Sequence, residues 1–380
     1  MTRALLPALL LASGCGFEDI VDDRMGTIDA DLAEIHDRLE DLEAENVALR
    51  DRLAAVEIGS GASGWIREPE TWLVPGDYAN LQAALVAAAD VRIWPSGRLT
   101  IQLEPGDHAL VGPITLAHPD GQRIDIIGDL EGTATTTLQC GGAGCFDLST
   151  GGSLGALAGL DLSGPGSGVA VEVGSNGRIT LGPGLRISKF ETGLSASTGG
   201  VIRGEGVILD SNRVGVMAES GGIIDLLEGS VRNSTLVGLA AEPGGLVVAY
   251  DVDVAGGTGG LSARGGQIWA PLASVSDQRR VAFSAAEGGR ILGARTRAAA
   301  NGIAYEAVDG GHLVMDNATA TGNVVDVSLD NGSSASMPGF TGSNAPGTVE
   351  VRYRSTWFSA GTMPGAGVVV SEHDGKFYAH

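Results

Sequence analysis

The chain has 380 residues, of which 60 are glycine and only 7 are Phe, 5 Trp and 5 Tyr, so glycine occurs at about twice its ordinary frequency of ~7%. The glycines follow no Gly-X-Y period, which excludes collagen, and a hydrophobic fraction of 43% excludes a disordered chain. The formal net charge of −22, from 24 basic and 46 acidic residues, disfavours nucleic acid as a partner and electrostatic docking to anionic lipid. Abundant glycine among small apolar residues predicts short strands joined by tight turns.

The first residues have the pattern of an export signal. Arg3 precedes an apolar stretch, 4–12, which is too short to span a bilayer. The four residues that end at Cys15, Ala-Ser-Gly-Cys, resemble the lipobox of bacterial lipoproteins, with alanine where that motif usually has leucine. An ordinary secretory signal with a chance cysteine is the alternative interpretation.

The lipobox resemblance implies a membrane anchor. Residues 1–14 would be removed as a signal peptide, and Cys15 would carry lipid at the start of a short N-terminus, 15–20. Gly16 stands where enterobacterial lipoproteins of the inner membrane have aspartate. The resemblance therefore implies the bacterial cell envelope, at the outer membrane or cell surface, with lipid on Cys15 as the contact to the membrane.

The two remaining cysteines are close in sequence. Cys140 and Cys145 are separated by four small residues, and in an exported protein such a pair most simply forms a local disulfide. A metal-binding pair is the alternative, but no nearby histidine or third cysteine completes a zinc set. We therefore expect no metal site.

A heptad pattern follows the N-terminus. Its core positions alternate in steps of four and three residues through 21–57, which predicts a coiled-coil stalk over 21–58. In a parallel, in-register bundle the flanking positions form five pairs, of which four are opposite in charge and none is repulsive. These pairs are Arg24–Asp29, Asp31–His36, Arg38–Glu43, Glu45–Arg50 and Arg52–Glu57.

The number of helices in the stalk is less strongly determined. The segments 38–43 and 52–57 resemble the Arg-h-x-x-h-Glu motif of trimeric coiled coils, whereas Asn46 at a core position favours a dimer. We prefer a homotrimer, with the chain as its own partner. A segment rich in Gly and Ser begins at Gly59 and predicts a linker over 59–74.

The rest of the chain is a repeat. Paired glycines, or Asn-Gly, recur every 21 to 23 residues, which gives a period of about 22; the second glycines are Gly177, Gly200, Gly222, Gly245, Gly266, Gly289, Gly311 and Gly332. Two residues after each of the first seven of these glycines stands Ile, Val or Leu. Asparagines recur near the twelfth position after the glycine, at Asn212, Asn233, Asn301 and Asn323, which predicts an asparagine ladder in a turn.

This repeat predicts the fold of the body. A period of about 22 suits three short strands per coil, and the pattern resembles the right-handed parallel β-helix of the pectin-lyase-like superfamily over 75–340. The resemblance implies an all-β solenoid with a capping helix near 77–85. A β-sandwich is the alternative. Residues 341–380 are expected to form a C-terminal cap or a trimerisation segment.

The sequence contains no recognisable catalytic constellation. Five aspartates fall in five different columns of the repeat and predict no calcium cluster: Asp210, Asp225, Asp251, Asp253 and Asp316. A second set of acidic residues recurs just before the paired glycines and is either a calcium-collecting ladder or a row of solvated turn residues: Glu219, Glu242, Glu287, Asp309 and Asp330. We expect no catalytic residues and no cofactor.

One column predicts an exposed apolar stripe. If the residues two positions after the glycine point inward, the next column, Val248, Trp269, Leu292 and Val314, points outward, with Tyr250 on the same face. Such a stripe marks an interface, either between the bodies of the trimer or with a sugar that stacks on the aromatic rings. A one-residue error in register would instead place the stripe in the core.

Two functions are consistent with these features. The first is a lipid-anchored, trimeric surface spike that binds a glycan or protein without catalysis. The second is a carbohydrate-active enzyme, a polysaccharide lyase or hydrolase, on the same scaffold. Because the β-helix family holds both kinds of protein, the fold alone does not decide between them.

The lipobox generates the first prediction. Bacteria that express the full chain and are fed an alkyne fatty acid should label the wild-type protein and not Cys15→Ala, because only Cys15 would carry the acyl chain. Equal labelling of the two proteins would show that Cys15 is not the acylated residue.

Overall fold

The computed structural model describes Arg38 and residues 64–131, 134–342, 348–352, 354–359, 367–370 and 376–379. The chain divides into two compact units, 1–63 and 64–380. The predicted signal peptide, Cys15 and the coiled-coil stalk fall in the first unit and, apart from Arg38, lie outside the described residues. Within the described part, no helix is long and apolar enough to cross a membrane.

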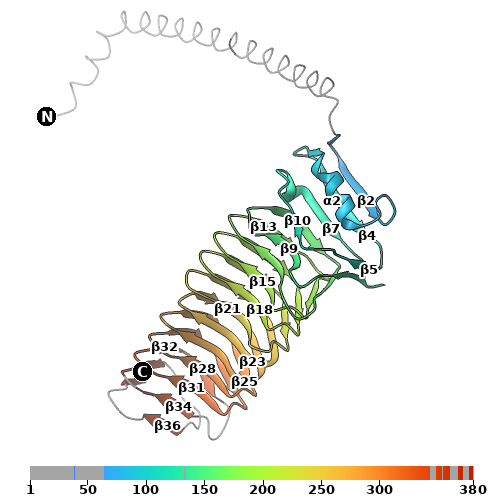
Figure 1. Cartoon of the computed structure of the whole chain (residues 1–380). Coiled ribbons are helices and arrows are strands. Elements are labelled where there is room, and N and C mark those ends of the chain that lie inside the picture. Colours follow the sequence, from blue (N-terminus) through green and yellow to red (C-terminus); the bar gives the residue numbers. More distant parts are fainter. Residues whose placement is uncertain are drawn as a thin grey trace, which may run out of the picture. The chain divides into compact units, whose positions relative to one another are not determined.

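The second unit is a parallel β-solenoid of about 12 turns, with about 23 residues per turn (Figure 1). A sheet of 14 strands forms its first face, and all the strand pairs in this sheet are parallel. The strands of the first face are β2 (Pro69–Val74), β4 (Arg98–Leu103), β7 (Ile124–Ile127), β10 (Ser153–Ala158), β13 (Arg178–Leu181), β16 (Val201–Glu205), β19 (Ile223–Leu227), β22 (Leu246–Tyr250), β24 (Gln267–Trp269), β26 (Arg290–Ala294), β29 (His312–Asp316), β32 (Ser334–Ser336), β35 (Thr356–Ser359) and β37 (Lys376–Ala379).

The remaining 21 strands of the solenoid form a second and a third face. The second face contains β5 (Gly106–Ala109), β8 (Thr136–Gln139), β11 (Asp161–Ser163), β14 (Arg186–Ser188), β17 (Ile208–Asp210), β20 (Ser230–Arg232), β27 (Arg297–Ala299), β30 (Thr319–Thr321) and β33 (Thr341–Gly342). The third face contains β6 (Ile114–Thr115), β9 (Gly144–Leu148), β12 (Val169–Val173), β15 (Thr192–Ala196), β18 (Val214–Ala218), β21 (Val237–Ala241), β28 (Ile303–Ala307), β31 (Val325–Leu329), β34 (Thr348–Val351) and β36 (Gly367–Val370). Two long strands cross from the second face to the third, β23 (Asp253–Arg264) and β25 (Ser274–Ala286).

The predicted arrangement of three parallel strands per coil is confirmed, and the β-sandwich alternative is wrong. In the early coils the repeat is longer than 22 residues, as shown by the pairing of Asp125 with Ala156 and of Ser153 with Arg178. Later steps, such as Val201 to Ile223, span 22 residues or close to it. The longer early loops raise the average to about 23.

Strand pairing also extends past both expected boundaries of the body. The first face begins at β2, inside the stretch 59–74 that was expected to be a linker, and a separate two-stranded sheet joins β1 (Trp65–Ile66) to β3 (Arg92–Ile93). At the other end, β34 to β37 continue the ladders of the first and third faces within 341–380.

A helix covers the N-terminal end of the core. Helix α2 (Leu81–Ala89) begins four residues later than the start of the expected capping helix, because the side chain of Asn80 accepts a hydrogen bond from the N–H of Ala83 at 2.8 Å. Its buried face, which includes Leu81, joins the hydrophobic core beside β2 and β4.

Left-handed backbone geometry defines the corners between faces. At the third corner, between the third face and the next first-face strand, Gly221 has a φ of +84°. A Cβ on the following residue, Gly222, would lie 2.1 Å from the carbonyl oxygen of Ala196 in the preceding coil. The paired glycines therefore recur because one supplies the left-handed turn and the other lets successive coils approach.

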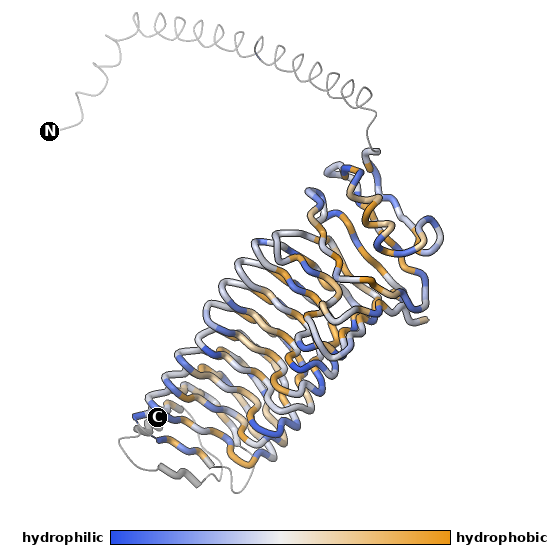
Figure 2. The backbone as a smooth tube through the Cα atoms, viewed as in Figure 1, coloured by the Kyte–Doolittle hydropathy of each residue, from blue (hydrophilic) through white to orange (hydrophobic). Residues whose placement is uncertain are grey.

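The interior is one continuous hydrophobic core, seen as orange segments along the strands of the coils in Figure 2. The column two residues after the glycine points inward as predicted, and its members Ile202, Ile268 and Ile291 are fully buried. Aromatic rings fill the later coils, where Phe283 stacks on Tyr305 at 5.0 Å between ring centroids. Burial raises the pKa of the Tyr305 hydroxyl, which hydrogen-bonds Thr296.

The predicted asparagine ladder lies at the second corner, between the second and third faces. Asn212, Asn301 and Asn323 are buried, and the side-chain oxygen of each accepts a backbone N–H of the preceding coil at 2.9 Å. Asn233 does not belong to the ladder, because it has a φ of +56° and its amide donates to Asp210. The buried residue in that coil is Ser234.

The ladder generates a prediction about stability. Asn301→Ala should lower the free energy of unfolding by about 1–3 kcal/mol, because it removes the side-chain acceptor of the Gln278 N–H and the amide donor to the carbonyl of Val275 inside the corner. Urea denaturation of the full chain measures the change. Gln267→Ala, at an exposed position of the first face, serves as a control and should shift the free energy of unfolding by no more than about 0.5 kcal/mol. Equal effects of the two substitutions would contradict the role given to the ladder.

Candidate functional site

The expected stripe lies on the outer surface of the first face. Val248 pairs with Trp269, Trp269 with Leu292, and Leu292 with Val314, so the four side chains stack in one column across successive coils. Trp269 is 54% exposed and Val314 38%, while Val248 and Leu292 are half-buried. The residues that precede them, such as Ile268 and Ile291, are fully buried, so the register error considered above does not occur.

The apolar surface is wider than the sequence column alone indicated. Tyr250, 43% exposed, stacks on Leu227, and the column on the other side of Val248 contributes Ile223 and Leu246. We define the aromatic patch as Ile223, Leu227, Leu246, Val248, Tyr250, Trp269, Leu292 and Val314. The three added residues follow the same alternation in neighbouring coils, so a search of every outward column of the sequence would have found them.

Polar side chains border the central column of the aromatic patch. Asp225 pairs with Val248 at one end of the central column, and Ser336 pairs with Val314 at the other. Exposed Gln267, Arg290 and His312 form the neighbouring column. At a spacing of about 4.8 Å per coil, the patch covers roughly 19 Å along the solenoid. An exposed apolar surface with a polar rim is typical of an interaction site.

The cysteine pair forms the expected local bridge. The structure joins Cys140 and Cys145 in a disulfide with their Cα atoms 5.1 Å apart, across the loop between β8 and β9. Because the two sulfurs are bonded to each other, the metal-binding alternative does not apply to this pair.

The aspartates of the repeat are distributed over different parts of the solenoid. Asp210 and Asp253 lie on the second face, Asp225 and Asp316 on the first, and Asp251 at the corner between the two. Among the described residues, no group of three His, Cys, Asp or Glu side chains could hold a metal ion.

Two carboxyl groups with shifted pKa values belong to structural contacts. Burial alone would raise the pKa of Asp210, but hydrogen bonds from Asn233, Arg186 and Ser211 together lower it. For Glu172 on the third face, burial and the neighbouring Asp147 raise the pKa. One of the acidic residues before the paired glycines, Glu287, forms an ion pair with Arg264, in which the arginine Nε lies 3.4 Å from the carboxylate Oε1.

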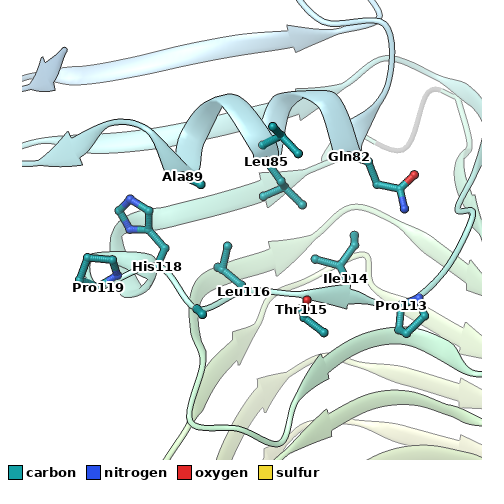
Figure 3. A pocket seen from close by; sticks show the side chains of 11 residues that line it. Gln82, Leu85, Ala89, Pro113, Ile114, Thr115, Leu116, His118 and Pro119 are labelled. Carbon is teal, nitrogen blue, oxygen red and sulfur yellow. The ribbon is translucent and has the colours of Figure 1, made fainter. Parts of the chain in front are cut away.

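A hollow of about 530 Å³ lies beside α2 (Figure 3). Apolar side chains line it, among them Leu85 from the helix and Ile114 and Leu116 from the segment opposite. The ring of His118 is occupied on both sides, since its Nε2 lies 2.8 Å from the carbonyl of Val91 and its Nδ1 accepts the N–H of Asp120.

Asp120, next to this hollow, is a structural residue. The Arg92 guanidinium, whose Nε lies 2.8 Å from Oδ2, holds the pKa of Asp120 below its ordinary value, and the N–H of Ile93 adds a second hydrogen bond. The carboxylate therefore ties β3 to the loop that precedes the 3₁₀ turn at Gly121–Arg123.

No protein-family model, curated protein or solved structure matches the chain. The aromatic patch on the first face is accordingly identified as the candidate site from its geometry and chemistry alone.

The exposed position of Trp269 generates a prediction about this residue and its buried neighbour Ile268. Trp269→Asp should lower the free energy of unfolding by no more than about 2 kcal/mol, because about half of the side chain is exposed and the loss is limited to strand propensity and cross-strand contacts. Ile268→Asp should cost at least ~4 kcal/mol, because it places an unpaired carboxylate in the core. Chemical denaturation followed by circular dichroism measures both. Similar losses in the two variants would mean that Trp269 is a core residue.

Proposed function

We propose that this protein is a lipid-anchored, trimeric and non-enzymatic protein of the bacterial cell envelope, located at the outer membrane or cell surface. Lipid on Cys15 would hold it at the membrane. The coiled coil over 21–58 would join three copies, and the solenoid body would present the aromatic patch to a glycan.

The observation that carries the proposal is the aromatic patch. Trp269 and Tyr250 expose their rings on a ladder of hydrogen-bonded strands, so their positions are set by the backbone and need little ordering when a ligand binds. Exposed rings on this face offer stacking surfaces with a polar rim that includes Gln267 and Arg290. These features suit the face of a sugar ring and the hydroxyl groups around it.

The type of β-solenoid that forms the body is also part of this proposal. We infer a right-handed β-helix similar to the pectin-lyase-like superfamily. Three strands per coil, the asparagine ladder at the second corner and the helix at the N-terminal end support it.

Two measurements test the proposed function. The full chain carrying Cys15→Ser, which removes the acylation site, should sediment as a trimer and bind a subset of glycans on an array. Trp269→Ala should weaken that binding about ten-fold, through loss of one stacking contact of ~1.4 kcal/mol. A monomer or dimer mass would contradict the trimer.

The control experiment concerns catalysis. Incubation of the bound glycans with the wild-type chain should leave their length unchanged. The appearance of unsaturated or reducing ends would contradict the non-enzymatic assignment and support the lyase or hydrolase alternative. Gln139→Ala, a substitution on the second face, serves as the matched variant that should bind as the wild type does.

A further inference from the structure

Helix α2 has an apolar outer face. None of its nine residues is charged, and the positions that are not buried in the core hold Gln82, Ala83, Val86, Ala87 and Ala89. The side chain of Val86 is 69% exposed. A surface helix ordinarily carries charged or polar side chains on its solvent side, and a helix that is apolar all round is ordinarily buried. In a chain with a net charge of −22, the outer face of α2 therefore has the character of a covered surface.

The hollow beside α2 extends this apolar surface (Figure 3). Val86 and Ala89 line it on the helix side, and Leu116 lines it on the opposite segment. None of its eleven lining residues is Asp, Glu, Lys or Arg. It differs in this respect from two hollows at corners of the solenoid, which are lined by charged residues that include Asp277 and Arg295.

The outer face of α2 and the hollow together form one surface at the N-terminal end of the body. We call it the cap surface and define it by Gln82, Val86, Ala89, Pro113, Leu116 and Pro119.

The chain enters the body next to this surface. The body begins at Gly64, and the following residue, Trp65, pairs with Arg92 in the small sheet of β1 and β3. The Nε of Arg92 lies 2.8 Å from Oδ2 of Asp120, which directly follows Pro119 of the cap surface. A strand pairing and an ion pair thus connect the first residues of the body to the end of the hollow.

Two exposed tryptophans lie at the same entry point. Trp65 is 36% exposed and Trp94 40%, and their rings meet edge to face with the centroids 5.6 Å apart. The guanidinium carbon of Arg92 lies 5.7 Å from the centroid of the Trp65 ring. These rings add to the apolar area at this end of the body, and contiguous exposed apolar area is typical of an interaction surface.

The connecting segment limits how far apart the N-terminal ends of associated copies can lie. Only residues 59–64 separate the expected end of the stalk at residue 58 from β1. Six residues reach about 20 Å when fully extended. If the stalk joins three copies, the tether gives their cap surfaces an effective concentration on the order of millimolar. A contact that is too weak to join free bodies is then sufficient.

We propose that the cap surface is the contact between the bodies of neighbouring copies of this chain. A contact between identical chains needs a protruding group and a receiving group on the same chain. Exposed Val86 and the hollow of about 530 Å³ supply these two groups. An uncharged, apolar surface fits a second apolar surface, and the copy tethered beside it carries one. This inference rests on the proposed function, because it requires that the copies associate, and it adds the surface on which their bodies meet.

The test places one reactive thiol on the cap surface of the full chain with Cys15→Ser. Because Cys140 and Cys145 are bonded to each other, Ala89→Cys supplies the single free thiol of each copy. A short bismaleimide should give a covalent dimer as the main product on a denaturing gel, since the reagent joins two thiols only where two cap surfaces meet. Val324→Cys is the control, at a residue that is 76% exposed between β30 and β31, and it should give little dimer.

A charge on the cap surface should abolish this contact. Val86→Glu, combined with Ala89→Cys, should remove most of the covalent dimer, because a carboxylate is costly to bury against apolar groups. The circular dichroism spectrum should stay unchanged, since Val86 is exposed within each body. The matched variant Val324→Glu, combined with Ala89→Cys, should keep the dimer.

Sedimentation equilibrium of the same proteins separates this inference from the proposed trimer. A trimer in which Ala89→Cys gives no covalent dimer would overturn the cap contact and leave the trimer standing. A monomer would show that both are wrong. A dimer that cross-links through Ala89→Cys would support the cap contact and contradict the trimer.

Two further outcomes would overturn the cap contact. Equal cross-linking through Val324→Cys, or cross-linking that survives Val86→Glu, would mean that the tether alone brings the thiols together. A thiol at Ala89→Cys that is shielded from a monofunctional maleimide but forms no dimer would mean that something other than a second copy covers α2.

Discussion

The hydrogen-bonded register between parallel coils is the constraint on which the rest of the structure depends. Every strand pairs with the equivalent strand one coil away, as Val248 does with Trp269 and Trp269 with Leu292. Residues at equivalent positions therefore stack about 4.8 Å apart along the whole body. An inward column builds the core, an outward column builds a continuous surface stripe, and a corner column repeats one backbone conformation.

The proposed site follows from this register. Among the described residues no layer covers the outward columns of the first face, so the apolar side chains of the aromatic patch remain exposed in an otherwise acidic protein. The polar column of Gln267, Arg290 and His312 lies next to these apolar side chains on the same face.

The sequence predicted the parts of the fold that repeat and missed those that do not. The glycine pairs and the column of Ile202, Ile268 and Ile291 predicted the parallel coils and the outward position of Trp269, because alternation and period are local properties. The longer early coils escaped notice, since their steps depart from the period of about 22, although Gly151-Gly152 already stands at the same corner before β10. The hollow beside α2 could not be predicted, because it depends on how the helix and the segment with Ile114 and Leu116 meet around an open space.

Hydroxyl-radical footprinting of the full chain, read by mass spectrometry, tests most directly whether the aromatic patch is a binding face. In the free protein Trp269 and Tyr250 should be oxidised rapidly, while buried Tyr305 and Trp357 stay unmodified. Addition of a bound glycan should protect Trp269 and Tyr250 and leave the others as they were. Protection of Trp269 in the absence of ligand, or no change when the glycan binds, would contradict the account.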